Sequence, residues 1–465
     1  MWPVFDKNGS LYFVSDEANG EYNLYTLQNN TKRQLTSFKS SIGRPQINVE
    51  GNRVVFTKDY QIFLYDVAAG SDQKVKITLA NNNPLGKNKD FNSKGNITNF
   101  SVSPDNKKLA FVSRGELFVS DVKGKFIKQI DINNTERVKE VAWLEDNKTL
   151  LYTRTNKGYA NIFSIAADGS QAEKQHTNEA RNNQNLSLNE KRTQAVYISG
   201  RDQLRTLDLT NFKSTVLVKD EFWALYAPQP YFSSDGTHVL FSAYRNFEHD
   251  VFTIRLSDKK ITNLTDTGVN ETDPVWSPDG KYVYYASNLT KPSYPYGMRE
   301  GHIYQMALNK YDDPFVAEEF DKLFEEKSED KDEKDSKKKK DKSEDEKEKP
   351  KLSITQEGLM ERTEQISPSY GFQIGLHVLK KDKTNHILYL SNHDEGEFKL
   401  WKTTISPFEE NKTEKVLDKV IRSYQIASAD ESDYILVNGD IHTLNIKNNS
   451  VEKIKLNHTF RRNLS

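Results

Sequence analysis

Residues 272–287 read TDPVWSPDGKYVYYAS and contain the pattern from which the fold is predicted. A residue before proline is disfavoured in the helical region, so Asp273 begins the stretch in an extended conformation. Residues 277–280, SPDG, have the composition of a tight turn. Residues 282–286 are aromatic and β-branched, which is typical of a half-buried strand. The stretch therefore predicts a β-hairpin.

The same hairpin pattern recurs along the chain. Clear copies cover residues 101–113, 141–153 and 231–242, and weaker copies start at Trp2, Pro45, Leu186, His377 and Ile426. A third strand follows, as at 23–26, 161–164 and 250–254, and a fourth ends in Leu-Thr, as at 33–36 and 261–265. Four strands per unit, with a period of about 40–50 residues, predict an all-β fold of the β-propeller class. An all-β sandwich is the alternative, but it has no reason to repeat a four-strand order.

The hairpins predict about nine units. Two occupy residues 1–77, a linker poor in periodicity covers 78–96, and seven units run through 97–457. Propellers usually have about four to eight blades, so we expect a seven-bladed propeller preceded by about two blades of another, incomplete one. Two blades cannot bury both of their faces alone, so they either belong with preceding blades or pack on the ring. Residues 458–465 are expected to start a following region, and the abrupt ends suggest a fragment of a longer protein.

A charged insertion interrupts the repeats at about residues 313–351. It begins with apolar residues at helix-like spacing and continues as SEDKDEKDSKKKKDKSEDEKEKP at 328–350. Such a tract cannot bury apolar surface, so we expect it to be disordered. A partner-binding arm is the alternative, although the balanced charge disfavours polyanions.

Composition excludes several classes of function. The 465 residues carry a net charge of −1, which provides no general attraction to nucleic acid or to an anionic membrane. The chain has no cysteine, so disulfides, thiolate nucleophiles and cysteine metal sites are excluded. No apolar run approaches the length that a membrane span needs, and no leader pattern opens the chain. We therefore expect no nucleic-acid partner and no membrane insertion.

Motifs of catalysis and cofactor binding are missing from the sequence. There is no Gly-x-Ser-x-Gly, HExxH, Walker or GxGxxG pattern. The pairs His249-Asp250 and His393-Asp394 are the best candidates for a catalytic dyad, but neighbours on a strand point to opposite faces, so neither pair is an obvious dyad. We predict no catalytic, cofactor-binding or metal-binding residue and no cofactor. The histidines lack metal-ligand spacing; they are His176, His238, His249, His302, His377, His386, His393, His442 and His458.

The turn aspartates Asp105, Asp235 and Asp279 are candidates for calcium binding or acid–base chemistry. Aspartate side chains commonly bond their own backbone in turns, and this structural role is the prediction here. Arg245 and Arg299 in blade loops are candidates to face a central channel. The sequence does not identify the substrate-channel residues.

Trp-Ser-Pro-Asp-Gly, an aromatic strand and a closing Leu-Thr resemble the hairpins of TolB and Tricorn-type propellers. The repeat is WD40-like only in the broad sense, since the Gly-His and Trp-Asp signature is missing. Two features resemble the Tricorn protease family in particular. Residues 354–362, ITQEGLMER, follow the charged insertion and resemble the family's Ile-Asp-x-Glu-Gly-Ile-x-x-Arg segment, and the layout resembles the end of one propeller joined to a second.

The resemblance implies that the parent protein is a serine peptidase active in proteolysis. Family members continue into a helical region, a PDZ domain and a protease core, and none of these is present in the 465 residues, so no catalytic residue carries over. The implied role is a non-catalytic gate for peptides or unfolded polypeptides in a homo-oligomeric, cytoplasmic parent, or a periplasmic one if a leader was lost. The alternatives are a TolB-like scaffold for protein binding and the propeller lid of a prolyl-oligopeptidase-type enzyme. The latter would need an α/β-hydrolase domain.

Overall fold

The computed structural model describes residues 2–78, 88–132, 136–222, 229–245, 248–292, 300–310, 351–382, 384–406 and 409–463. The chain divides into two compact units, residues 1–86 and 87–465, which are described separately. Most of the predicted charged insertion, residues 311–350, lies outside the described part of the chain.

The first unit contains two four-stranded antiparallel sheets in its described residues, each with its strands in chain order. They are β1 (Val4–Phe5), β2 (Leu11–Ser15), β3 (Asn23–Gln28) and β4 (Thr31–Gln34), and β5 (Gln46–Ile47), β6 (Arg53–Lys58), β7 (Gln61–Asp66) and β8 (Ser71–Lys74). Successive side chains of β2 point to opposite faces, and Tyr12 and Val14 lie on the buried face. They pack with Val54 and Phe56 of β6 in one core. The other faces are less covered, and Ile62 is 39% exposed.

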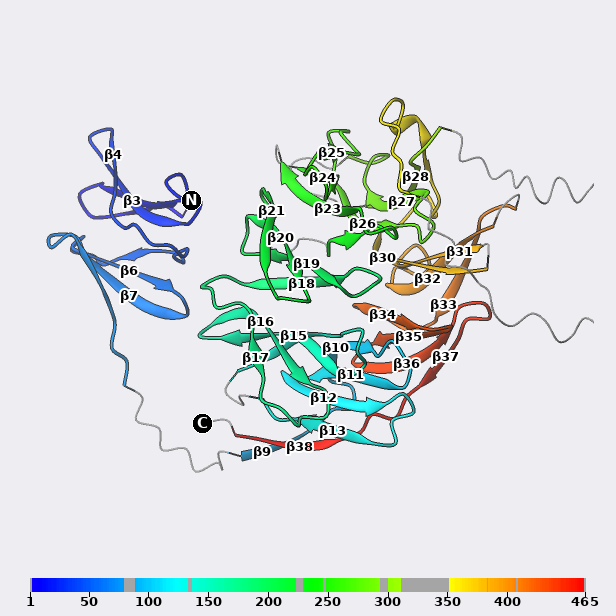
Figure 1. The fold of residues 1–465 in the computed structure, drawn as a ribbon. Coiled ribbons are helices and arrows are strands. Elements are labelled where there is room, and N and C mark those ends of the chain that lie inside the picture. The colour runs from blue at the N-terminus through cyan, green and yellow to red at the C-terminus, as the bar shows by residue number, and fades with distance from the viewer. Residues whose placement is uncertain are drawn as a thin grey trace, which may run out of the picture. The chain divides into compact units, whose positions relative to one another are not determined.

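The second unit contains seven four-stranded sheets among its described residues, again with the strands of each in chain order (Figure 1). The first three are β10 (Ile97–Val102) to β13 (Ile127–Ile130) through β11 (Lys108–Ser113) and β12 (Glu116–Asp121); β14 (Val138–Trp143), β15 (Thr149–Asn156), β16 (Tyr159–Ala166) and β17 (Lys174–Gln175); and β18 (Asn183–Leu188), β19 (Gln194–Ser199), β20 (Gln203–Asp208) and β21 (Ser214–Lys219). The next two are β22 (Tyr231–Phe232), β23 (His238–Arg245), β24 (Glu248–Arg255) and β25 (Ile261–Asn263); and β26 (Glu271–Trp276), β27 (Tyr282–Ser287), β28 (His302–Ala307) and β29 (Thr363–Gln365). The last two are β30 (Gln373–Lys381), β31 (Thr384–Ser391), β32 (Lys399–Ile405) and β33 (Lys412–Leu417); and β34 (Tyr424–Ala429), β35 (Ser432–Val437), β36 (Asp440–Asn445) and β37 (Ser450–Lys453). The all-β prediction and its repeated four-strand unit are confirmed.

The predicted hairpin of residues 272–287 is formed by β26 and β27. In its turn, Asp279 accepts hydrogen bonds from the Ser277 hydroxyl at 2.6 Å and from the Lys281 amide at 3.1 Å. Gly280 has φ +70°, a conformation that favours glycine. Local hydrogen bonds and one glycine therefore determine this turn, which explains why the sequence predicts it.

The Leu-Thr signature also has a structural explanation. The Thr265 hydroxyl accepts a hydrogen bond from the Val251 amide at 3.0 Å, and Thr36 does the same for Leu24 at 2.9 Å; Thr177, which follows a histidine, accepts from the Ile162 amide at 2.8 Å. The preceding Leu264 is buried in the core between neighbouring sheets. Leucine thus fills the core while threonine satisfies an amide that the short fourth strand leaves unpaired.

Apolar cores lie between consecutive sheets of the second unit. One core combines the first and the last sheet, since Phe100 and Phe111 pack with Tyr434 and Leu436. The seven sheets accordingly follow one another around a common centre in Figure 1, with β34–β36 beside β10.

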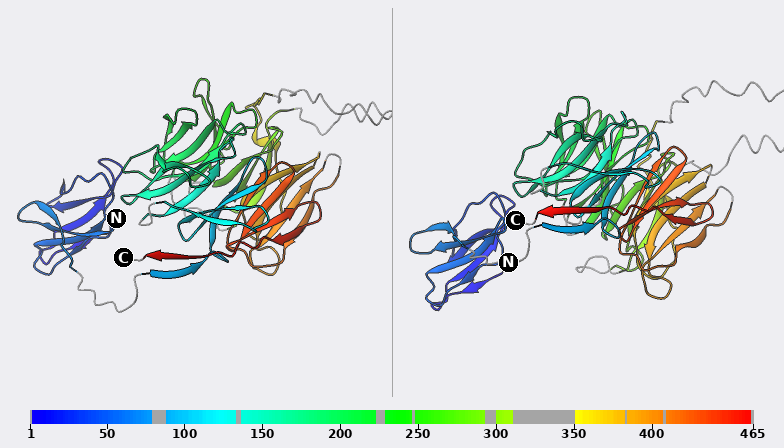
Figure 2. Two further views of the ribbon diagram at one scale, coloured as in Figure 1. Left: turned by 60° about the horizontal axis from the view of Figure 1, so that its bottom comes forward. Right: turned by 90° about the horizontal axis from the view of Figure 1, so that it is seen from below.

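A two-stranded ribbon accompanies these sheets. Its strands, β9 (Asn88–Asn92) and β38 (Thr459–Asn463), pair antiparallel and are visible side by side in Figure 2. Phe460 packs against Phe91 and Phe118, with ring centroids 6.0 and 5.1 Å away. Residues 88–92 were expected in a linker and 459–463 in a following region, because single phenylalanines in polar surroundings have no strand periodicity. Their strand character comes from pairing with each other.

Candidate functional site

The structure assigns structural contacts to the two histidine–aspartate pairs. His249 packs against Tyr244 with tilted rings whose centroids are 5.0 Å apart, and burial lowers the pKa of His249. His393 Nδ1 lies 2.6 Å from the Ser391 hydroxyl, whereas Asp394 pairs with Lys415 at 2.8 Å. Among the described residues, neither aspartate forms a hydrogen bond with the histidine beside it.

Asp250 instead interacts with Glu271 of the next sheet, and Asp250 Oδ1 and Glu271 Oε2 are buried with no other hydrogen-bond partner among the described residues. Both carboxylates are buried, at 5% and 0% exposure. Burial raises the pKa of both, to about 7 for Glu271, although Thr267 and Ser287 donate hydrogen bonds to it. Ionising both of two neighbouring buried carboxylates is unfavourable, so we expect them to share a proton.

All three turn aspartates have the predicted structural role. Burial alone would raise the pKa of Asp105, but hydrogen bonds from Ser103 and Lys108 lower it to about 2. Asp235 accepts from Ser233 at 2.6 Å and also from the Leu352 amide at 2.7 Å. In the described part of the chain, no group of three or more His, Cys, Asp or Glu side chains could hold a metal ion.

Arg245 forms an ion pair with Asp220 and lies 4.2 Å over the ring of Phe252, so it is engaged within its own sheet region. Arg299 lies outside the described residues. Arg362, in the segment that carries the family resemblance, donates to main-chain oxygens of Ala307, Glu357 and Thr355. This arginine therefore holds the return from the insertion onto β28, a structural role. Among the described residues, no helix is long and apolar enough to cross a membrane.

The region where the first strands of the seven sheets adjoin is here called the hub. Side chains of these strands hydrogen-bond to the main chain of their neighbours, in series from β10 onward, and the last bonds join β34 to β10. The bonds are made by Asn99 and Ser101 to β14, Glu140 to β18, Gln229 to β18, Trp276 to β22, Asp273 to β30, Tyr424 to β30, and Gln425 to β10.

Bulges in the first strands direct these side chains. Register shifts occur between Thr272 and Val275 in β26 and between Ile374 and His377 in β30. Within the first of them, Asp273 has φ +53°, which is uncommon for a residue other than glycine. A bulge re-aims a side chain that regular alternation would place elsewhere.

Four successive first strands bring polar groups together at the hub. Asp273 of β26 accepts from the Gly375 amide of β30 at 3.0 Å, and the Tyr424 hydroxyl of β34 donates to the Gly375 carbonyl at 2.6 Å. Burial, followed by the charge of Asp273, raises the pKa of Tyr231 on β22 to about 12. Tyr231, Asp273 and Tyr424 remain half-buried, so none is sealed inside a core.

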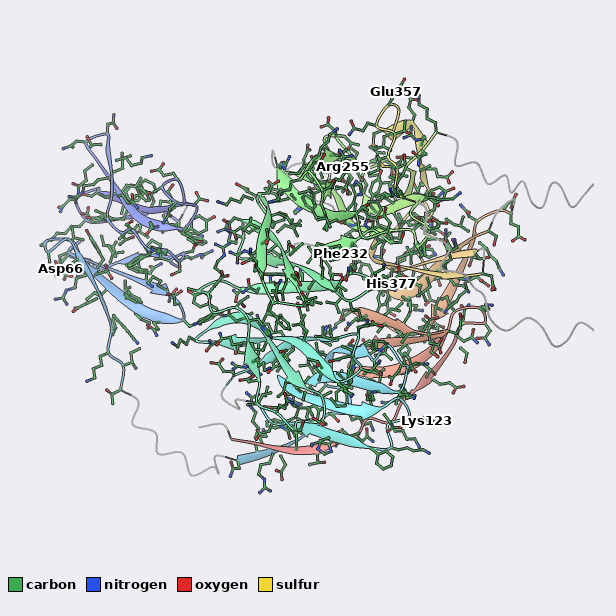
Figure 3. The ribbon with its side chains drawn as sticks, in the orientation of Figure 1. Asp66, Lys123, Phe232, Arg255, Glu357 and His377 are labelled. Carbon is green, nitrogen blue, oxygen red and sulfur yellow. The ribbon has the colours of Figure 1, made fainter. Side chains whose placement is uncertain are left out.

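A cavity of about 300 Å³ opens at the hub and is lined by residues from four sheets, among them Tyr231, Trp276 and His377. Figure 3 places His377 and Phe232 near the middle of the second unit, with Lys123 at its periphery. Burial lowers the pKa of His377 to about 4 against the opposing charge of Asp433. His377 is therefore neutral at pH 7.

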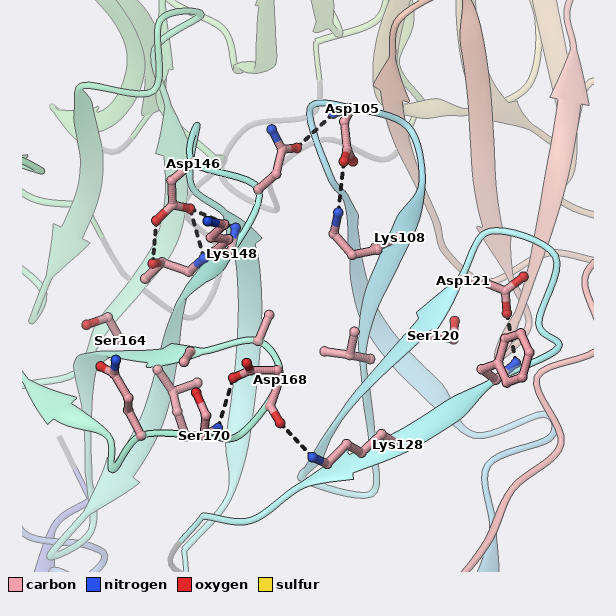
Figure 4. A pocket seen from close by; sticks show the side chains of 18 of the residues that line it. Asp105, Lys108, Ser120, Asp121, Lys128, Asp146, Lys148, Ser164, Asp168 and Ser170 are labelled. Carbon is pink, nitrogen blue, oxygen red and sulfur yellow. Dashed lines mark hydrogen bonds and ion pairs between the residues drawn. The ribbon is translucent and has the colours of Figure 1, made fainter.

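A larger groove of about 910 Å³ lies between the sheets β10–β13 and β14–β17 (Figure 4). Its charged side chains are engaged locally: Lys108 pairs with Asp105 at 2.9 Å, and Lys128 donates to the Asp168 carbonyl at 2.6 Å. The two-residue strand β17 leaves this side of its sheet open. These contacts are local to each side chain and do not bring a set of reactive groups together in the groove.

The sequence did not identify the hub residues. Asp273 was noted only because it precedes a proline, and Tyr424 carried no motif. A signal was present in retrospect, since Asp273 is a charged residue at a first-strand position where the copies at 97–102 and 183–188 have none.

Comparisons with known proteins agree with this fold. No protein-family model matches the chain. The chain is 24% identical over 287 residues to the tricorn protease of Thermoplasma acidophilum. The matched region covers 60% of this chain and 26% of that protein. The crystal structure of the tricorn protease gives a TM-score of 0.60 at 15% identity, covering 100% of this chain and 44% of that chain. The structure of a putative TolB from Agrobacterium tumefaciens matches at 16% identity and a TM-score of 0.36. The match covers 46% of this chain and 77% of the TolB chain.

Repeated four-stranded antiparallel sheets define an all-β protein of the propeller type. By sequence and by fold, the chain is similar to a region of tricorn protease. It spans 26% of the length of the curated relative and 44% of the solved chain.

Proposed function

We propose that the chain is the non-catalytic propeller part of a tricorn-like serine protease and acts as a gate or channel for unfolded peptides. The single observation that carries the proposal is the similarity to tricorn protease in sequence and over the whole fold. The hydrogen bonds that run through all seven first strands and return to β10 support a closed, seven-bladed ring. A ring of that kind leaves an axial passage whose lining comes from the first strands.

The proposal assigns binding and passage to this chain and cleavage to other parts of the parent. Its partners are peptide or unfolded polypeptide and further copies of the parent, which is placed in the cytoplasm, or in the periplasm if a leader precedes it. The structural roles of His249, His393 and the turn aspartates support a non-catalytic chain, because these side chains are engaged within the fold.

A peptidase assay with unstructured fluorogenic peptides tests the proposal. It compares the 465-residue chain with a form extended by the sequence that follows residue 465 in its gene. We expect only the extended form to cleave. Cleavage by the 465-residue chain would refute the proposal. An inactive extended form that still captures a protein partner would favour a TolB-like scaffold, and a downstream hydrolase domain with a Gly-x-Ser-x-Gly motif would favour a prolyl-oligopeptidase-type lid.

A further inference from the structure

Two lysines on the first strands are neutralised by ion pairs, whereas the carboxylates of Glu140 and Asp273 are held by main-chain amides. Lys380 and Lys381 of β30 form ion pairs with Asp279 and Asp433 at 3.1 and 2.9 Å. Asp273 accepts a main-chain hydrogen bond, but no lysine or arginine in the described ranges forms an ion pair with it. Burial raises the pKa of Asp273, so a cation bound beside this carboxylate would provide the counter-charge that the described side chains do not.

Two tyrosines accompany this carboxylate. The charge of Asp273 acts on the phenols of both Tyr231 and Tyr424, which come from β22 and β34 on its two sides along the series of first strands. The Tyr424 hydroxyl is committed to the Gly375 carbonyl, so it is not available to neutralise the carboxylate. Both tyrosines are half-buried residues that pack against the apolar cores beside them.

A carboxylate beside half-buried aromatic residues is the chemistry that binds ammonium and guanidinium groups. The carboxylate provides a charge-assisted hydrogen bond, and the ring faces attract a cation through their negative quadrupole. An acidic side chain would meet repulsion from Asp273 and from the same ring faces. Neutral His377, near the same hub, adds no positive charge to counter this preference.

We propose that Asp273, Tyr231 and Tyr424 form a recognition site for cationic groups of a polypeptide, so that the hub takes basic segments in preference to acidic ones. The cationic groups are lysine and arginine side chains and the peptide amino terminus. This inference rests on the proposed channel function and specifies the substrate class for it.

Binding of two matched peptides to the 465-residue chain tests the inference. Both are unstructured and fluorescently labelled at the carboxyl end; one contains four lysines, and the other contains four acetyl-lysines at the same positions. Acetylation removes the charge and keeps the aliphatic stem. Fluorescence anisotropy should show about tenfold tighter binding of the lysine peptide, the size expected for a partly desolvated cation contact.

Asp273→Asn is the decisive variant. Asparagine tolerates positive φ and retains an oxygen for the Gly375 amide, so the bulge is preserved while the charge is removed. Its near-ultraviolet circular dichroism should match the wild type, and its preference for the lysine peptide should fall to nearly onefold. The matched control is Asp258→Asn, which removes the same charge from an exposed turn after β24 and should keep the tenfold preference.

The outcomes separate the inference from the proposed function. Equal binding of both peptides to the wild type would overturn cation recognition and leave the channel proposal standing. An unchanged preference in Asp273→Asn, or an equal loss in Asp258→Asn, would also overturn the assignment to Asp273. If neither peptide binds, the channel proposal fails and the inference fails with it.

Discussion

Replacing Glu271 by glutamine tests the shared proton between two sheets of the second unit. Glu271 begins β26, is fully buried, and interacts with Asp250 of β24. Gln373 begins β30 at the corresponding position and is also fully buried, where it accepts from Ser367 at 3.0 Å. The next sheet thus shows that a neutral amide of the same size is accommodated at this position.

The magnitude follows from the pKa of Glu271. Burial raises it from 4.5 to about 7, which corresponds to about 3 kcal/mol of folding free energy that depends on pH. Between pH 4.5 and pH 7 the folded state binds more protons than the unfolded state. The free energy of unfolding therefore falls as pH rises through this window, and the contribution of the pair is lost above about pH 7. Glutamine does not titrate, so Glu271→Gln should lack this decrease and should be the more stable form at pH 8.

Urea unfolding followed by tryptophan fluorescence at pH 5, 6, 7 and 8 measures the effect. Hydrogen exchange of the Val251 amide, which is bonded to Thr265 beside the pair, provides a local measurement. Gln373→Glu is the reverse control: it places a second buried carboxylate between sheets and should make stability fall more steeply with pH. If Glu271→Gln retains the wild-type decrease between pH 5 and 8, the shared proton is not the cause and the reasoning is refuted.

Three further substitutions test other parts of the fold. Thr177→Val should destabilise the second unit by about 1–3 kcal/mol in urea unfolding, because the Ile162 amide loses its acceptor; an unchanged midpoint would contradict this role of the threonine. Phe460→Ala should cost about 3–5 kcal/mol and speed exchange of β9 amides, since the ring packs on Phe118; a ribbon that exchanges as slowly as before would show that this contact does not hold it. Arg362→Met should lower the melting temperature and expose the segment around residues 354–362 to protease, as the freed carbonyls lose their donor; resistance equal to the wild type would argue against this anchoring.

Local features of the fold were predictable because each is made by residues close together in the chain. The turn of residues 277–280 depends on a serine, an aspartate and a glycine within four positions. The aromatic strand of residues 282–286 follows directly, and the same arrangement recurs in each clear copy. The role of the turn aspartates was predicted for the same reason, since their main partners lie two residues away.

The candidate site was not predictable in the same way. Asp273 becomes notable only when the bulge in β26 aims it toward Gly375, which is 102 residues further along the chain. The pairing of Asp250 with Glu271 likewise arises between two sheets. Neither contact has a local signature, because first strands meet only after their sheets have packed side by side.

From the sequence alone, the repeat, the strand–turn–strand unit and the all-β class were determined, since hydrophobic alternation and turn chemistry act over a few residues. Tertiary structure decided how strands distant in sequence meet: β9 pairs with β38 across the length of the second unit, and seven first strands gather their polar groups at one hub. Such contacts depend on the packing and bulges of whole sheets, and a residue's immediate neighbours in the chain do not encode them.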